Sequence, residues 1–329
     1  MSNILEIKSL NVHFRGNKGI FVAVDDISFE IKKKEKLAIV GESGSGKSVT
    51  AMAIMGLLFS NRKAIISGQV IYSGKNIFEL SKKELQTLRK SDLSMIFQDP
   101  VMSLNPVFTI GQQLVEAYIM SKKQSKKQAN DNAVKQLEKV GILDAKNVMH
   151  LYPHQLSGGM CQRVMIAIAL ASNPQLLIAD EATTALDVTI QAQILKLLDD
   201  LHHREHNSLM FITHDLIVAK LFTDRIIVMN EGRMVESGRS IDVYDNPLHP
   251  YTKLLIQAVP TLGKRKRLHS IPKELDSSFD RKQGCQFYER CNFRQSKCLN
   301  ERPSLRLIDK EHAVACHFCE EIKDGSSNY

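Results

Sequence analysis

One segment constrains this chain more than any other: Gly41-Glu42-Ser43-Gly44-Ser45-Gly46-Lys47-Ser48. It matches the pattern G-x-x-x-x-G-K-S/T and follows the short apolar run 37–40, which predicts a buried strand leading into a turn. Its glycines permit positive φ angles, so that successive backbone N–H groups can point inward around a polyphosphate. A helix expected from Lys47 onward adds the positive end of its dipole. We therefore expect this phosphate loop to bind a nucleoside triphosphate.

The side chains of the phosphate loop have separate expected roles. Lys47 is expected to reach the β- and γ-phosphates, and the hydroxyl of Ser48 is expected to ligate Mg²⁺. The residues of this region that we expect to contact the nucleotide are Gly41, Ser43, Gly44, Ser45, Gly46, Lys47, Ser48 and Val49.

Composition places the chain among folded globular proteins, since 43% of its 329 residues are hydrophobic and 24% are charged. No apolar run approaches the ~20 residues that span a bilayer, and the N-terminal residues show no secretory signal pattern. We therefore expect a cytosolic protein that reaches a membrane only through a partner. The net charge of +8 is spread over scattered basic runs without interleaved aromatics. We interpret it as a solvated basic surface and expect no nucleic-acid partner.

The pattern along the chain predicts an α/β fold. Runs rich in β-branched residues predict strands at 4–14, 21–31, 37–40 and 65–72. Helical periodicity is expected from Ser81 to about Ala171, including helices at 112–120 and 129–140. Short buried strands are expected at 176–179 and 209–212, with a helix at 189–201 between them and a hairpin at 225–236 after them. The stretch 264–280 indicates a linker to a cysteine-bearing tail.

An apolar strand ends in two carboxylates at Asp180 and Glu181. A strand end beside the phosphate loop is where an acid that holds Mg²⁺ belongs, and Asp180 suits that role. Glu181 follows it directly and is placed to polarise the attacking water as a general base.

A second anion site is indicated by Leu156-Ser157-Gly158-Gly159-Met160, which precedes another helical run. The hydroxyl of Ser157 and the amides of Gly158 and Gly159 would lie at a helix N-terminus. One triphosphate does not need two such sites from one subunit. We therefore expect this segment to serve a nucleotide bound to a facing subunit.

At this point the motifs resemble those of the ATP-binding subunits of ABC transporters, over residues of about 4–260. Segment 156–160 resembles the signature motif of that family, Gln98 its Q-loop glutamine, Asp187 in Ala185-Leu186-Asp187 its D-loop, and His214 its switch histidine. The resemblance implies ATP and Mg²⁺ as cofactors, with Ser48, Gln98 and Asp180 around the metal ion and Glu181, Gln98 and His214 as the catalytic residues. Phe14 is the expected adenine-stacking aromatic, with Phe21 as the alternative.

The resemblance also implies a fold: a P-loop NTPase (RecA-like) core with an antiparallel β subdomain, a helical subdomain at about 99–171 and a small C-terminal module. We expect an ATP-binding domain at 1–260 and an extension at 261–329.

A narrower resemblance rests on Met102-Ser103-Leu104-Asn105-Pro106, on segment 245–252 and on the tail. These are similar to the ATPase subunits of the oligopeptide/dipeptide/nickel importers, the dipeptide type in particular. This implies peptide import at the cytoplasmic face of the inner membrane, with two permeases, an extracytoplasmic solute-binding protein and a second, non-identical ATPase as partners. Nickel complexes and glutathione are alternative solutes, and a homodimer is the alternative assembly. A non-transport ATPase of the same superfamily and a nucleotide switch without turnover are the rival functions.

Cysteines are concentrated in the tail, at 285, 291, 298, 316 and 319. Disulfides are disfavoured in a reducing cytosol. Zinc ligands usually occur in tight C-x₂₋₄-C pairs, and of these cysteines only Cys316 and Cys319 have that spacing. Spacing alone leaves three interpretations open: an iron–sulfur cluster, zinc or unliganded thiols. The resemblance implies a 4Fe-4S cluster held by Cys285, Cys291, Cys298 and Cys316, with Cys319 left over.

Overall fold

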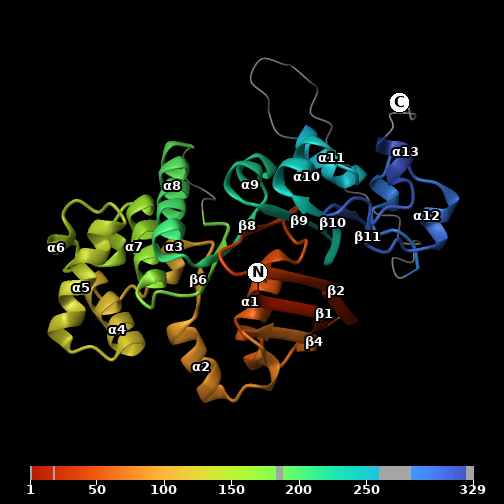
Figure 1. Cartoon of the computed structure of the whole chain (residues 1–329). Helices are drawn as coiled ribbons and strands as arrows, with labels where there is room; N and C mark the ends of the chain where they lie inside the picture. The colour runs from red at the N-terminus through yellow and green to blue at the C-terminus, as the bar shows by residue number, and fades with distance from the viewer. Residues whose placement is uncertain (1, 18, 183–187, 259–282, 324–329) are drawn as a thin grey trace.

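The computed structural model describes residues 2–17, 19–182, 188–258 and 283–323, and Figure 1 shows their arrangement. Strands form two sheets. The smaller sheet has the order β2-β1-β4-β5, with β1 at Asn3–Gly16, β2 at Gly19–Lys32, β4 at Ala64–Tyr72 and β5 at Lys75–Asn76. The larger sheet has the order β11-β12-β10-β9-β3-β8-β7-β6. Its strands are β3 (Lys36–Val40), β6 (Leu93–Ile96), β7 (Leu176–Asp180), β8 (Ser208–Thr213), β9 (Arg225–Asn230), β10 (Arg233–Arg239), β11 (Arg306–Leu307) and β12 (Ala313–Val314).

Helices of the described residues connect these strands and cover the larger sheet. They are α1 (Lys47–Ile54), α2 (Lys82–Ser91), α3 (Pro100–Ser103), α4 (Ile110–Lys122), α5 (Lys126–Lys139), α6 (Ala145–Val148), α7 (Gly158–Leu170), α8 (Val188–Glu205), α9 (Leu216–Phe222), α10 (Ser240–Asp245), α11 (Pro250–Gln257), α12 (Ser296–Asn300) and α13 (Cys319–Lys323). None of the helices in the described part of the chain is both long and apolar enough to cross a membrane.

The centre of the larger sheet is parallel. Strand β3 pairs in parallel with β8 on one side and β9 on the other, and β7 continues the series to β6. The strands β10, β12 and β11 are then added antiparallel at the β9 edge. Side chains of β3 and β7–β9 are almost all buried because helices and the smaller sheet cover both faces. The α/β class and the predicted hairpin at 225–236 are therefore confirmed.

Strand β6 corrects the sequence analysis, which expected continuous helical structure from Ser81 to about Ala171. Its four residues are too few to show a strand period, and helices surround them on both sides. The strand forms because Leu93, Met95 and Ile96 are buried against β7, with Leu93 opposite Leu176 in the parallel ladder. This strand matters for the site because it delivers the chain to Gln98.

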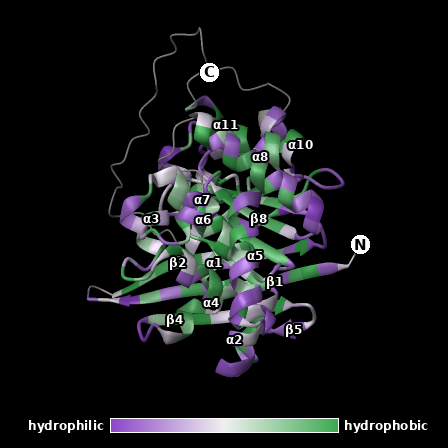
Figure 2. Cartoon of the chain, turned by 90° about the vertical axis from the view of Figure 1, so that its left-hand side faces the viewer, coloured by the Kyte–Doolittle hydropathy of each residue, from purple (hydrophilic) through white to green (hydrophobic). Residues whose placement is uncertain are grey.

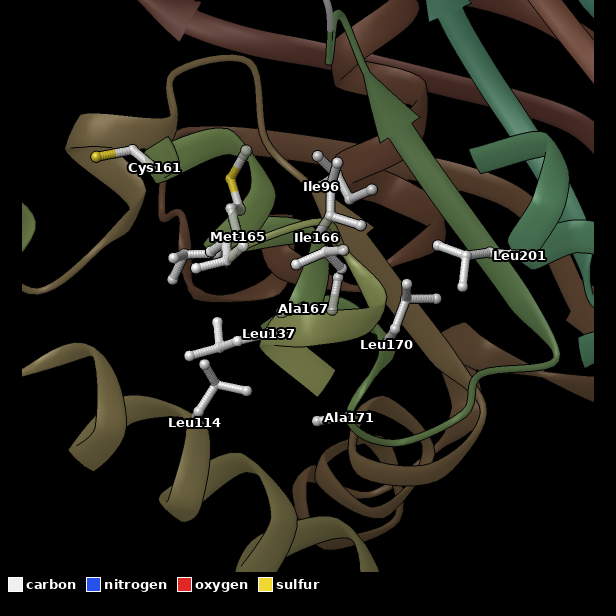
Figure 3. Packing of buried hydrophobic residues seen from close by; sticks show 14 of the residues in the cluster. Ile96, Leu114, Leu137, Cys161, Met165, Ile166, Ala167, Leu170, Ala171 and Leu201 are labelled. Carbon is white, nitrogen blue, oxygen red and sulfur yellow. The ribbon is translucent and has the colours of Figure 1, made fainter. Parts of the chain in front are cut away.

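Two helices of the helical subdomain begin at caps that the sequence supplies. Thr109 and Gln112 form a capping box at α4, and Ser125 and Gln128 form one at α5. Helix α7 lies between these helices and the larger sheet. Figure 3 shows its apolar face, with Met165, Ile166 and Leu170 against Ile96, Leu114, Leu137 and Leu201. Because one cluster contains side chains from the helices and the sheet, the subdomain packs directly on the sheet.

The smaller sheet packs on the face of the larger sheet opposite to α7 and the helical subdomain (Figure 1). Its long strand β1 buries Leu5 and Ile7 and, beyond a shift in register, Leu10 and Val12, in the cluster that also contains residues of α1 and the larger sheet. Figure 2 shows how hydropathy is distributed over the chain: hydrophobic residues are concentrated in the middle of the molecule, and hydrophilic residues are frequent in the turns at its surface.

The cysteine-bearing tail is joined to the core by backbone and side-chain contacts. Strand β12 pairs with β10, so the tail extends the larger sheet. Phe287 is 2% exposed and packs edge-on against Tyr251 in the same cluster as Val40 and Val228. The division at residue 260 stays a prediction, and the expected linker lies outside the described residues.

Candidate nucleotide-binding site

The phosphate loop connects β3 to α1, as the sequence predicts. A Cβ atom at Gly41 would overlap the carbonyl oxygen of Met229, and one at Gly46 would lie 2.5 Å from the carbonyl oxygen of Ala23. Gly46 also has a φ of 99°, which favours glycine. The loop can therefore pass this close to β2 and β9 only with glycine at these positions, and α1 begins directly after it at Lys47.

Lys47 points back into the loop. Its side chain is 3% exposed, and its Nζ donates to the carbonyl oxygens of Gly41 and Glu42, each at 2.8 Å. Burial lowers the pKa of Lys47, whereas the carboxylates of Glu181, Asp180 and Glu42 oppose that shift. A buried ammonium held by loop carbonyls is suited to meet the phosphates of a nucleotide.

Ser48 and Asp180 come together from α1 and the end of β7. The Oγ of Ser48 donates to Oδ1 of Asp180 at 3.0 Å. Asp180 is buried, and this burial raises the pKa of its carboxyl group. A hydroxyl beside a buried carboxylate at the phosphate loop fits the oxygen ligands that Mg²⁺ prefers, because a divalent cation would offset the cost of burying the negative charge.

Glu181 is the point at which the predicted catalytic residues meet. Its Oε2 accepts from Nε2 of Gln98 at 2.8 Å and lies 3.9 Å from Nδ1 of His214. Its Oε1 lies 3.8 Å from Nζ of Lys47. Interaction with the Glu181 carboxylate raises the pKa of His214. The segments that follow β6 and β8 and the end of the phosphate loop thus place Gln98, His214 and Lys47 around one carboxylate.

The backbone of Glu181 is strained. Its φ is 45°, in the left-handed region, which costs a non-glycine residue about 1–2 kcal/mol. The conformation is held because the N–H of Glu181 donates to the carbonyl oxygen of Ile212 on β8 at 2.9 Å. Strain of this kind collects at functional sites, where the surrounding structure holds it in place.

The second predicted anion site lies apart from the phosphate loop. Ser157 is the N-cap of α7, where its Oγ accepts from the N–H of Met160, and Ser157 and Gly158 are exposed. A Cβ at Gly158 would meet nothing within 4 Å. In the described residues no hydrogen bond or ion pair joins Ser157 or Gly159 to the phosphate loop. The arrangement agrees with an anion site that opens outward, and its role stays a prediction.

Two further predicted contacts are not decided by the geometry. Asp187 lies outside the described residues. Phe14 on β1 and Phe21 on β2 are paired in register; Phe14 is partly buried on the hydrophobic core, whereas Phe21 is 62% exposed. Phe14 therefore stays the predicted adenine contact and Phe21 the alternative.

Comparisons with known proteins agree with this geometry. Residues 24–184 match the ABC transporter family, and residues 235–298 match the family described as the oligopeptide/dipeptide transporter, C-terminal region. The chain is 44% identical to the oligopeptide transport ATP-binding protein AppD of Bacillus subtilis, over 98% of both chains. It is 43% identical to the dipeptide transport ATP-binding protein DppD of Escherichia coli, over 96% of both chains. The chain belongs to the ATP-binding subunits of ABC transporters.

Among solved structures, this ABC subunit is similar to the dimeric ATP-binding cassette MJ0796 bound to ADP and Pi. The TM-score is 0.65 at 28% identity, covering 72% of this chain and 98% of that one. The cassette fold and the membership of a transport-coupled ATPase family that the sequence predicts are therefore confirmed, and so is the resemblance to the oligopeptide/dipeptide branch.

Four cysteines of the tail of this ABC subunit line one cavity, Cys285, Cys291, Cys298 and Cys316, together with His249 and Phe287. Burial raises the pKa of the Cys285 thiol to about 11 and that of Cys291 to about 12. Within the described residues, no group of three or more Cys, His, Asp or Glu side chains is arranged to hold a metal ion.

Sequence analysis missed the residues that hold Glu42 of the phosphate loop. Its N–H donates to the Oη of Tyr251 at 2.9 Å, and its carboxylate accepts two hydrogen bonds from Arg290. These partners lie 209 and 248 residues further along the chain, so no local pattern could have indicated them.

Substitution of Lys47 and of Glu181 should separate nucleotide binding from turnover. Lys47→Ala should weaken MgATP binding by roughly 30-fold or more, since removing one partner of a buried charge contact costs several kcal/mol. Glu181→Gln should bind MgATP normally and lower the hydrolysis rate by about 10²–10⁴, the usual contribution of a general base. Binding is measured with a fluorescent ATP analogue, and hydrolysis by phosphate release.

The matched control is Glu138→Gln, which changes an exposed carboxylate on α5. It should leave both quantities unchanged. Equal turnover in wild type and Glu181→Gln would remove Glu181 from the role of general base.

Proposed function

We propose that this chain hydrolyses ATP to energise the import of dipeptides or oligopeptides, as a peripheral subunit on the cytoplasmic face of the inner membrane. The observation that carries the proposal is the meeting of Gln98, Lys47 and His214 at the carboxylate of Glu181. The names of relatives that align over nearly the whole chain support the choice of peptides.

In the proposed mechanism, each side chain acts where the fold places it. The Glu181 carboxylate accepts a proton from the attacking water, which Gln98 helps to orient. His214 contacts the γ-phosphate, and Lys47 binds the β- and γ-phosphates. Ser48, Asp180 and Gln98 would hold Mg²⁺, which neutralises charge on the phosphates when bound. Phe14 stacks on the adenine.

The complete site is proposed to be composite. Ser157, Gly158 and Gly159 of one ATPase contact the nucleotide on the phosphate loop of the facing ATPase, and Asp187 is proposed as a further nucleotide-binding residue. Closure of the two ATPases on ATP and their reopening after hydrolysis would move the helical subdomain, which passes the motion to two permeases. An extracytoplasmic solute-binding protein supplies the solute.

A groove between α4, α7 and β6 is the proposed contact with a permease. It has a volume of about 270 Å³ and is lined by Phe97, Leu104, Met120 and Met165 among others. Beside it, the segment that follows Gln98 exposes apolar side chains, with Met102 84% and Val107 71% exposed. Exposed apolar groups rimmed by polar ones are typical of protein contacts. The apolar groups of this segment follow Gln98, whose side chain bonds the carboxylate of Glu181.

Uptake by cells that lack the chain tests the solute. The wild-type gene should restore uptake of radiolabelled dipeptides and longer peptides, whereas Glu181→Gln should leave uptake at least about 100-fold lower, as loss of the general base requires. Glu138→Gln serves as the control and should restore uptake. Restored uptake of nickel or glutathione without peptides would assign the transporter to these alternative solutes.

The assembly is proposed to contain a second, non-identical ATPase. Ser157→Arg should then impair hydrolysis at the phosphate loop of that partner, while MgATP binding at Lys47 of this chain stays within about twofold of wild type, because the two regions are not in contact. Native mass measurement of the purified transporter supplies the stoichiometry. Two copies of this chain and no other ATPase would exclude the heterodimer and leave the homodimer.

The tail is proposed to hold a 4Fe-4S cluster on Cys285, Cys291, Cys298 and Cys316. The support is that these four thiols, widely spaced in sequence, line one cavity, and iron–sulfur clusters are held by four such thiolates. Cys319 lies outside this lining, and its Sγ accepts from Arg306 at 3.2 Å. Zinc ligands usually occur in C-x₂₋₄-C pairs, and the four cavity cysteines are spaced more widely than that.

Protein purified without oxygen should therefore be brown and contain about four irons per chain. Replacing any one of the four cavity cysteines with Ser should remove the colour and most of the iron. Cys319→Ser is the matched control and should retain both. Colourless protein with stoichiometric zinc, or without metal, would contradict the cluster.

A further inference from the structure

Glu42, the second residue of the phosphate loop, is held through three separate groups. Its N–H donates to the Oη of Tyr251 at 2.9 Å. Its Oε1 and Oε2 accept from the two terminal nitrogens of Arg290 at 2.8 and 2.9 Å. Its carbonyl oxygen accepts from Nζ of Lys47 at 2.8 Å. Glu42 therefore connects the C-terminal tail to the lysine that meets the phosphates.

Arg290 is also held in place by contacts that do not involve Glu42. It ends the short 3₁₀ helix Tyr288–Arg290. The N–H of Tyr288 donates to the carbonyl oxygen of Cys285 at 3.0 Å, and the N–H of Arg290 donates to that of Phe287 at 3.2 Å. Its guanidinium lies over the rings of Tyr251 and Phe287, at 5.7 and 5.4 Å from their centroids. The side chain is 16% exposed. A bidentate pair formed by a preorganised guanidinium is stronger than an ordinary surface ion pair.

The charge of Glu42 has a consequence for nucleotide binding. A carboxylate in the phosphate loop repels a triphosphate at short range, unless a cation neutralises it. Arg290 provides that cation, because its two terminal nitrogens bond both carboxylate oxygens of Glu42. Because the hydrogen bonds are bidentate, Arg290 also fixes the direction of the Glu42 side chain, and with Tyr251 it fixes the start of the loop.

We propose that Arg290 is a positioning residue for ATP, which acts through Glu42 and makes the cysteine-bearing tail part of the nucleotide site. Without Arg290 the Glu42 side chain loses both of its bonds to that guanidinium, and its carboxylate is left uncompensated in the phosphate loop. This inference requires only that the phosphate loop binds ATP. It is independent of the transported solute, of the partner subunits and of any metal in the tail.

A double-mutant cycle on the full-length chain tests whether Arg290 affects ATP binding through Glu42. Arg290→Gln should weaken binding of a fluorescent ATP analogue with Mg²⁺ by about five- to tenfold, the size expected for a charge-assisted bidentate contact. In a Glu42→Gln background, the same substitution should change the affinity by less than about twofold, because coupled residues are not additive. Arg294→Gln is the matched control. Arg294 is an exposed arginine of the same segment that bonds the carbonyl oxygen of Glu289, and its loss should leave affinity unchanged.

Two results would overturn the proposal. An unchanged affinity in Arg290→Gln would show that the contact does not affect binding. An equal loss in both backgrounds would show that Arg290 acts on the phosphates directly or through the stability of the tail. Thermal unfolding is measured for each variant, and Arg290→Lys replaces Arg290→Gln if the latter unfolds the tail. Lysine keeps the charge and the hydrocarbon stem but not the planar fork, so we expect a loss of about two- to fourfold that also disappears in the Glu42→Gln background.

Discussion

The parallel register of the larger sheet is the constraint on which the rest of the structure depends. Strands β3, β8, β7 and β6 run in the same direction, so their carboxyl ends lie at one edge. The segments that follow them carry Lys47, His214, Glu181 and Gln98, which are separated by long stretches of chain but converge at this edge. Ligand sites at the carboxyl ends of parallel strands follow from this topology.

Several groups of the nucleotide site lower the stability of the fold. Lys47 and Asp180 are buried charged groups, and Glu181 has a left-handed backbone conformation. These costs are offset locally by the contacts of Lys47 with loop carbonyls and of Glu181 with β8. They are offset globally by the hydrophobic clusters on the two faces of the sheet, one of which includes the helical subdomain (Figure 3). The site therefore depends on the packing of elements that never touch the nucleotide.

The tail belongs to the same physical unit as the sheet. Strand β12 extends the sheet beyond β10, Phe287 fills part of the core beside Tyr251, and Arg290 reaches the phosphate loop. A second tail arginine, Arg302, joins Arg233 of β10 at the carboxylate of Asp25 on β2. With these contacts the tail touches both the phosphate loop and the smaller sheet. The cysteine cavity is thus connected to the nucleotide site by a short path of ion pairs and packed rings.

The sequence by itself determined the phosphate loop, the strand that ends in Asp180 and Glu181, and the α/β class. Each of these follows from consecutive residues whose spacing matches a local conformation. It did not reveal β6, since four residues between helices are too few to show a strand period. Nor did it reveal that Tyr251 and Arg290 hold Glu42, since contacts across 209 and 248 residues leave no local pattern. The convergence on Glu181 and the attachment of the tail were decided only by tertiary structure. They depend on which strands pair and which faces are buried together, and these are relations between residues that lie far apart in the sequence.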